Sequence, residues 1–417
     1  MNRLLILGAG TAGTMIVNKL HDRLPPDWEI QVVEPSHRHL YQPGLLFVPF
    51  HLEDPDGLIR PSKNLLPDDV TVTHSEVERV VPEANKVLLV DGTEVAYDQL
   101  VIATGTTPRP DQTPGMMESG WRKTVHEFYT LDGAIALRDA LDEFKGGRLV
   151  VHVTEMPIKC PVAPLEFAFL ADDHFRKLGM RDEVELAYAT PLSGAFTKPT
   201  CSQALGGMLD ERHIRLEADF YVEHIEEGKI VSYDEREIPF DMLVTVPTNM
   251  GAEFVARSGL GDELNYVKVD PHNFLATGYE NIFAVGDASN IPTSKAGSVA
   301  HFAVEDFADN FLEHIAGRPM ERSFDGHSNC FIEAGNGKAL LIDFNYDTEP
   351  LPGTYPIPGI GPMKLLKESR INHWGKLAFK SIYWHLLLPG RRLPVPNHMS
   401  MAGKVRPEQP QREEINV

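Results

Sequence analysis

Short, mostly apolar runs punctuate the chain, and each has the length of a single strand. The first comprises Leu4 to Leu7 and is followed by a glycine-rich turn. Unbroken apolar runs of this length are typical of strands buried on both faces of a parallel sheet. The runs lie at residues 4–7, 30–33, 100–103, 148–153, 242–246 and 281–285. We therefore expect an α/β fold built on parallel sheets.

One pattern occurs twice along the chain. Residues 87–97 predict a hairpin with an Asp91-Gly92 turn, and this hairpin leads into the run at 100–103. Residues 229–240 predict a second hairpin, which leads into the run at 242–246. The repeat predicts two similar Rossmann-like domains, the second inserted into the first. The boundaries we expect are 1–108 and 255–325 for the first domain, 109–254 for the second, and 326–417 for a C-terminal region.

The turn after the first apolar run has the spacing of a dinucleotide-binding fingerprint. Gly8 allows a tight turn, Gly10 lets the backbone approach a pyrophosphate, and Gly13 allows close packing of helix on strand. The pyrophosphate would lie at the N-terminus of the following helix, where free N–H groups favour an anion. Glu34 ends the second run, where a carboxylate accepts from a ribose hydroxyl and repels a 2′-phosphate.

Two further segments identify the nucleotide by resemblance. Residues 281–288 form an apolar run that ends in Gly286-Asp287, and residues 100–105 form one that ends in Thr104-Gly105. Together with the fingerprint, they resemble the flavoproteins with two dinucleotide-binding domains, the relatives of disulfide reductases. The resemblance implies FAD as the cofactor, with Asp287 at its ribityl or phosphate groups and Thr104 and Gly105 at the flavin.

The second domain lacks such a fingerprint. Its first strand should end near Val153, yet residues 154–164 contain no glycine, and their prolines lack the N–H groups that would bind a pyrophosphate. We infer that this domain does not bind NADH. Cys160 stands there instead, before the next expected helix.

Three segments resemble a narrower family, the sulfide:quinone oxidoreductases and the flavin subunit of flavocytochrome c sulfide dehydrogenase. They are Pro157-Ile158-Lys159-Cys160 with Ala163-Pro164, Asn329-Cys330-Phe331, and the stretch from Arg370 to Lys380. The resemblance implies that Cys160 and Cys330 are catalytic, flank the flavin ring and carry sulfur. It places Phe331 at the quinone, and Lys295 and Gly297 at the flavin pyrimidine. We also expect the helix N-terminus and Lys159 to lower the pKa of Cys160.

One feature departs from that family. Many members carry a third cysteine shortly before residue 130, which can attach to the flavin, and residues 124–130 contain none. The remaining cysteine, Cys201, does not match that position. We expect non-covalent FAD and a structural thiol at Cys201, with a variant role for Cys201 as the alternative.

Charge is distributed unevenly. The formal charge of −21 disfavours nucleic acid as a partner, yet residues 363–406 contain nine basic residues and one acid. Between Ile371 and Leu388, apolar and aromatic residues follow helical spacing. Such a helix flanked by basic residues favours a peripheral position on a membrane surface; a core helix or a dimer contact is the alternative. We expect no leader, no membrane span and no metal site.

The function that follows is oxidation of hydrogen sulfide with reduction of a membrane quinone. Three alternatives remain: the flavin subunit of a sulfide dehydrogenase that uses a cytochrome, a non-pumping NADH:quinone dehydrogenase, and a non-catalytic flavin-binding redox sensor. The quinone, the sulfur product, the membrane face and a homo-oligomeric state are left open.

Overall fold

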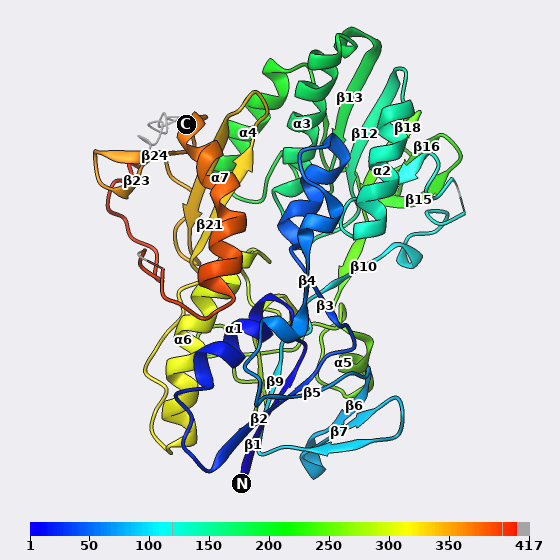
Figure 1. Ribbon diagram of the computed structural model, residues 1–417. Helices are drawn as coiled ribbons and strands as arrows, with labels where there is room; N and C mark the ends of the chain where they lie inside the picture. Colours follow the sequence, from blue (N-terminus) through cyan, green and yellow to red (C-terminus); the bar gives the residue numbers. More distant parts are fainter. Residues whose placement is uncertain (119, 394, 407–417) are drawn as a thin grey trace, which may run out of the picture.

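The computed structural model describes residues 1–118, 120–393 and 395–406 (Figure 1). A five-stranded parallel sheet forms the lower part of the view in Figure 1. Its order is β20 (Ile282–Ala284), β9 (Gln99–Ile102), β1 (Asn2–Leu7), β2 (Trp28–Val33) and β5 (Thr71–Thr73). Helices α1 (Thr11–Leu20) and α6 (Gly297–Ile315) pack against each other beside this sheet. Four of the predicted apolar runs are confirmed as its strands.

A second five-stranded parallel sheet lies in the upper part of the view. Its order is β11 (Val125–His126), β18 (Met242–Val246), β12 (Gly147–Val153), β13 (Val184–Ala189) and β14 (Arg215–Glu217). Helix α3 (Ala163–Leu178) packs on β12 and β13. Helices α2 (Leu131–Glu143) and α4 (Pro199–Glu211) complete the upper part of the view, whereas α5 (Glu253–Arg257) packs on β6 (Val77–Val81) in the lower part (Figure 1).

Both predicted hairpins are confirmed, and each belongs to a three-stranded antiparallel sheet. One sheet contains β6 (Val77–Val81), β7 (Lys86–Leu89) and β8 (Glu94–Ala96); the other contains β15 (Val222–Glu226), β16 (Lys229–Ser232) and β17 (Glu237–Pro239). The first leads into β9 and the second into β18. Short pairs β3 (Arg38–Leu40) with β4 (Ile59–Pro61), and β10 (Thr107–Arg109) with β19 (Thr248–Met250), join the remaining segments.

The C-terminal region forms a four-stranded sheet covered by one helix. The strand order is β21 (Ser328–Glu333), β22 (Ala339–Phe344), β24 (Gly361–Leu365) and β23 (Gly353–Ile357). Helix α7 (Arg370–Ile382) packs on β21, β22 and β24 and continues into a π-helical turn, Tyr383–Leu387. Ser369 caps α7, because its hydroxyl accepts from the Asn372 N–H at 3.1 Å. Within the described residues, no helix is long and apolar enough to cross a membrane.

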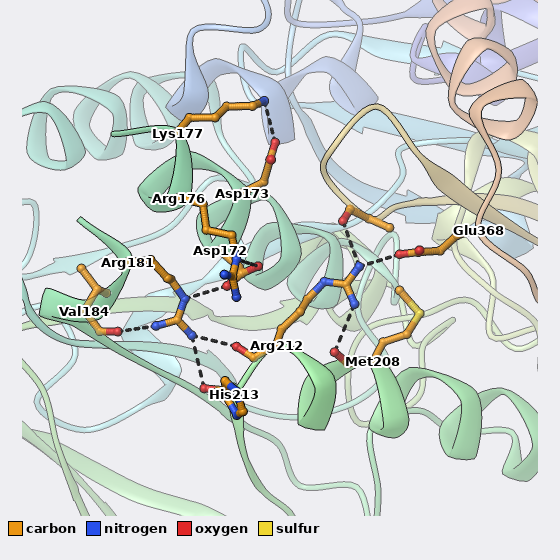
Figure 2. Close-up of polar contacts among 11 residues, drawn as sticks. Asp172, Asp173, Arg176, Lys177, Arg181, Val184, Met208, Arg212, His213 and Glu368 are labelled. Atoms are coloured by element: carbon orange, nitrogen blue, oxygen red, sulfur yellow. Dashed lines mark hydrogen bonds and ion pairs between the residues drawn. The ribbon is translucent and has the colours of Figure 1, made fainter. Parts of the chain in front are cut away.

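An arginine network connects the start of α7 to the second sheet (Figure 2). Arg212 donates to the Glu368 carboxylate and to the Met208 carbonyl, at 3.2 Å for the latter. Arg181 donates to Asp172 at 2.6 Å and to the Arg212 carbonyl at 2.9 Å. Because Glu368 directly precedes the cap of α7, this network fixes the helix relative to the second sheet.

Candidate functional site

The glycine-rich turn between β1 and α1 has the geometry that the fingerprint predicts. Gly8 adopts φ +97°, and a Cβ there would lie 2.7 Å from the Ala103 carbonyl oxygen. A Cβ on Gly13 would lie 1.9 Å from the Gly8 oxygen, so helix and strand can approach only without side chains. A Cβ on Gly10 would meet no atom within 4 Å. The turn is therefore tightly packed at Gly8 and Gly13, and it leaves open space beside Gly10.

Polar groups beside this turn keep unused hydrogen-bonding capacity. The Glu34 carboxylate accepts from the Ala9 N–H at 2.7 Å and the Ser36 N–H at 2.9 Å, one bond for each oxygen. Each carboxylate oxygen can accept a second bond. The buried Thr104 hydroxyl has no hydrogen-bond partner among the described residues. A Cβ on Gly105 would meet no atom within 4 Å.

Asp287 and Lys295 meet at the end of β20. The Lys295 ammonium donates to the carbonyls of Asp287 at 3.0 Å and Ser289 at 2.8 Å, and it lies 3.8 Å from the centre of the Tyr266 ring. Burial lowers the pKa of Lys295 to about 8, although the Asp287 charge opposes this. Burial raises the pKa of Asp287, and the charges of Lys295 and Lys159 oppose it.

Cys160 lies directly beside that lysine. Its main-chain N–H donates to the Lys295 carbonyl at 2.6 Å, so the two segments run side by side. Cys160 adopts φ +50°, a left-handed conformation that is uncommon for residues with a side chain and that recurs at functional sites. Its carbonyl accepts from the Ala163 N–H at 2.9 Å, which turns the chain into α3. The structure thus joins the predicted sulfur residue to the predicted flavin residue Lys295.

The expectation of a lowered pKa at Cys160 is wrong. Burial raises its pKa to about 12, the Glu166 charge raises it further, and Lys376 partly opposes them. Helix α3 begins three residues later, at Ala163, and the Lys159 ammonium turns away to donate to Gln42 Oε1 at 2.8 Å. Loss of solvation therefore outweighs the favourable charges in the reduced protein.

The structure brings the three cysteines into one neighbourhood. All are free thiols, and Cys330 lies on β21 with its sulfur 3.8 Å from the Ser328 hydroxyl. Burial raises the pKa of Cys330, while Ser328 and Lys376 lower it. A negative charge on Cys330 raises the pKa of Cys160 and that of Cys201. Burial has the largest effect on Cys201 and raises its pKa to about 12. Cys201 is 0% exposed, so it lies near the pair but away from solvent.

A buried ion pair that the sequence analysis missed lies beside these cysteines. Lys376 of α7 contacts Glu166 of α3 at 2.8 Å, and the Glu166 side chain is 0% exposed. Glu166 also accepts from the Glu333 N–H at 2.6 Å, and Lys376 donates to the Phe331 carbonyl at 3.2 Å. Burial disfavours the charged lysine, but Glu166 and Cys160 outweigh it and raise the pKa of Lys376. Lys376 lies within the segment 370–380 that resembles the sulfide:quinone oxidoreductases, and Glu166 lies two residues after Pro164, the end of another such segment. This nearness to the resembling segments was the only signal of the pair in the sequence.

Two aromatic rings lie where β21 and α6 meet α7. A Cβ on Gly375 would lie 2.6 Å from the Phe331 ring, so this glycine makes room for the predicted quinone residue. Phe379 lies against Gly297, 3.8 Å from the position of a Cβ there. Sequence reasoning assigned Phe379 to the membrane helix, whereas its ring is half-buried and directed at the start of α6.

Comparison with known proteins identifies the family. The family model for pyridine nucleotide-disulphide oxidoreductases matches residues 2–305, about three quarters of the chain. This chain belongs to the pyridine nucleotide-disulphide oxidoreductase family. It is 28% identical to the mitochondrial sulfide:quinone oxidoreductase of Dictyostelium discoideum, a match covering 94% of this chain and 87% of that protein. It is 25% identical to the sulfide-quinone reductase of Aquifex aeolicus, covering 91% and 89%.

A solved structure shares the fold. The sulfide:quinone oxidoreductase of Aquifex aeolicus superposes with a TM-score of 0.79 at 21% identity, covering 94% of this chain and 92% of that one. The resemblance proposed from sequence is therefore confirmed, as is the α/β fold class.

Family membership makes the chain a flavin-dependent oxidoreductase with FAD as its cofactor. The residues fit that cofactor. The open space at Gly10 would hold the pyrophosphate and Glu34 could accept from a ribose hydroxyl, while the buried Thr104 hydroxyl has no partner in the described part of the chain. Gly286, at φ +73°, lets the end of β20 approach Ala12 of α1.

Proposed function

We propose that this chain oxidises hydrogen sulfide to sulfane sulfur, with FAD, and reduces a membrane quinone. One observation carries the proposal. Cys160, in the loop before α3, donates its main-chain N–H to the Lys295 carbonyl at 2.6 Å. Lys376 donates to the carbonyl of Phe331, the residue after Cys330, and its charge acts on both cysteines. Two relatives of the chain are named sulfide:quinone oxidoreductase and sulfide-quinone reductase, and these names support the same activity.

The turn after β12 favours sulfide over NADH as the electron donor. Residues 154–164 contain no glycine, and Glu166 lies buried in the first turn of α3. A dinucleotide would need that helix N-terminus for its pyrophosphate, and the Glu166 carboxylate disfavours an anion there. A cysteine therefore occupies the place that a nucleotide has in NADH-dependent relatives.

The chemistry balances with the residues present. Hydrogen sulfide loses two electrons and two protons, and its sulfur becomes the outer sulfur of a persulfide on Cys160 or Cys330. The quinone gains two electrons and two protons. FAD, when bound, supplies the path for the electrons. Burial raises the pKa of both cysteines, and the Lys376 charge opposes part of that rise, so Lys376 is the group that stabilises a thiolate at either position.

The quinone would lie between β21 and α7. Phe331 follows Cys330 directly and rests on Gly375, and Phe379 rests against Gly297. Two half-buried rings on opposite elements supply apolar walls for a flat ligand. The same helix that carries Phe379 presents its other side to solvent.

That outer side of α7 supports a membrane surface. Ile371 is 40% exposed, Trp374 64% and Leu377 53%, so three large apolar side chains face solvent on one helix. Tyr383 and Trp384, by contrast, are buried, so the membrane-facing set is smaller than the helical pattern suggested.

The basic residues of this region divide into two groups. Lys376, Lys380 and Lys404 form ion pairs with Glu166, Glu53 and Asp343 and so belong to the protein interior or its edge. The other six are exposed: Lys364, Lys367, Arg370, Arg391, Arg392 and Arg406. Arg392 also lies 3.7 Å from the Glu305 carboxylate. An exposed apolar helix face with basic residues on both flanks matches an anionic lipid surface, despite the strongly acidic chain.

Anaerobic turnover of the holoenzyme with sulfide and a short-chain quinone tests the proposal. We expect one quinol for each sulfide consumed and no reduction of a soluble cytochrome c in parallel assays. Reduction of the cytochrome without reduction of the quinone would favour the sulfide dehydrogenase alternative.

A further inference from the structure

The two residues that flank Gly10 are held by side chains from distant parts of the chain. The Thr11 hydroxyl lies 2.8 Å from the Tyr383 hydroxyl, and the Ala9 carbonyl lies 3.1 Å from Nδ1 of His39. Nε2 of His39 lies 2.6 Å from the same Tyr383 hydroxyl. Together with the backbone of residues 9–11, these groups close a ring of hydrogen bonds around Gly10.

The direction of each bond in this ring follows from its chemistry. The Ala9 carbonyl can only accept, so Nδ1 of His39 carries the proton and donates. Burial lowers the pKa of His39 to about 4, so its imidazole is neutral at pH 7 and Nε2 is an acceptor. Tyr383 therefore donates to His39, and its oxygen accepts from the Thr11 hydroxyl.

Most of the ring lies away from solvent. Tyr383 is 1% exposed and His39 is 4% exposed, whereas Thr11 is half-buried. A bond lost between Tyr383 and His39 therefore leaves a buried polar group without its partner. The segment after α7 is fixed on α1 at a second point, where the Asn18 side chain donates to the Leu388 carbonyl at 2.7 Å. The C-terminal region is thus docked along the helix that begins at the glycine-rich turn.

No side chain of the described residues caps helix α1, and the turn before it is held by Glu34 at the Ala9 N–H, by Thr14 at the Ala9 carbonyl and by the ring. Gly10 occupies the N-cap position and offers no side chain, so the N–H groups of the first turn stay free for an anion. Their directions depend on the peptide groups of Ala9 and Thr11, the two residues that the ring holds.

We propose that Tyr383 is a positioning residue of the FAD site, which fixes the turn Ala9–Thr11 in the conformation that receives the pyrophosphate. The C-terminal region then has a second task, retention of the cofactor. This role depends on FAD binding at the first sheet and is independent of sulfide and quinone, so it stands or falls separately from the proposed function.

The test is the substitution Tyr383→Phe, which removes one hydroxyl and keeps the ring. We expect the dissociation constant of FAD, measured by the fluorescence of FAD released on serial dilution of the holoenzyme, to rise about tenfold. The matched control is Tyr346→Phe, because Tyr346 also donates one hydrogen bond from a partly buried hydroxyl, to the Pro271 carbonyl at 2.9 Å, on another element.

A second variant separates positioning from general loss of stability. Thr11→Val breaks the same ring from the other side, and we expect Thr11→Val/Tyr383→Phe to weaken FAD binding by less than the product of the single effects. An unchanged dissociation constant in Tyr383→Phe, a change equal to that of Tyr346→Phe, or independent effects of the two substitutions would each overturn the proposal.

Discussion

The main-chain N–H of Cys160 donates a hydrogen bond to the main-chain carbonyl of Lys295 at 2.6 Å. Both residues lie in loops that follow strands of different sheets: Cys160 follows β12 and Lys295 follows β20. The bond holds the proposed sulfur site against the proposed flavin site. Because it uses main-chain atoms, it survives changes of the Cys160 side chain, which makes that side chain a clean target for mutation.

Cys160→Ser and Cys330→Ser should each reduce sulfide-dependent quinone reduction to background while FAD stays bound, because sulfur transfer requires both thiols. Cys201→Ser should have a mild effect, since Cys201 is fully buried. Steady-state turnover and the flavin spectrum of each variant measure this. Cys201→Ser is the matched control, because Cys201 lies near enough to Cys330 for a charge there to raise its pKa. An equal loss of activity in Cys201→Ser would mean that the wrong pair of cysteines has been chosen.

Denaturation by heat or acid should release all FAD into the supernatant, because residues 124–130 contain no cysteine to attach it. Absorbance of the supernatant and of the precipitated chain measures the partition. Flavin that remains with the precipitate would reveal a covalent bond.

Lys376→Met should lower the free energy of unfolding by about 3–5 kcal/mol, because it leaves the Glu166 carboxylate buried without its cation. Denaturant titration of the holoenzyme measures this. Lys380→Met is the matched control: its pair with Glu53 is more exposed and should cost ~1 kcal/mol or less. The double variant Glu166→Gln/Lys376→Met should recover part of the loss; no recovery would show that the lysine acts through packing instead.

Trp374→Ser/Leu377→Ser should weaken binding to anionic vesicles, because both side chains are more than half exposed on α7. Co-sedimentation with vesicles measures binding, and added salt should weaken it without abolishing it, since each basic residue contributes about 1 kcal/mol. Leu178→Ser/Tyr233→Ser removes two equally exposed apolar side chains elsewhere and should bind like the unaltered protein. Full-length protein that ignores anionic vesicles at low salt would contradict the membrane surface and favour a soluble acceptor.

Local sequence patterns predicted the parts of the fold that depend on neighbouring residues. The glycine spacing at residues 8–13, the buried strands and both hairpins follow from sterics and periodicity within a few residues. The Glu166–Lys376 pair and the Tyr383–His39 bond could not be predicted this way, because each joins residues hundreds of positions apart.

Burial was the quantity that the sequence could not supply. The pKa of Cys160 was predicted to fall from its neighbours Lys159 and the helix, and it rises because desolvation is the largest effect. Tyr383 and Trp384 fit the helical pattern of a membrane face, yet the π-helical turn directs them into the core. In both cases the nature of the residue was clear, but its surroundings were set by distant segments.

Anaerobic stopped-flow mixing of the holoenzyme with either sulfide or NADH tests the central claim most directly. The account predicts that sulfide bleaches the flavin absorbance rapidly and with saturation, whereas NADH does not, because residues 154–164 offer no glycine-rich turn and Glu166 occupies the first turn of α3. Fast, saturable bleaching by NADH, with none by sulfide, would contradict it and make the protein an NADH:quinone dehydrogenase.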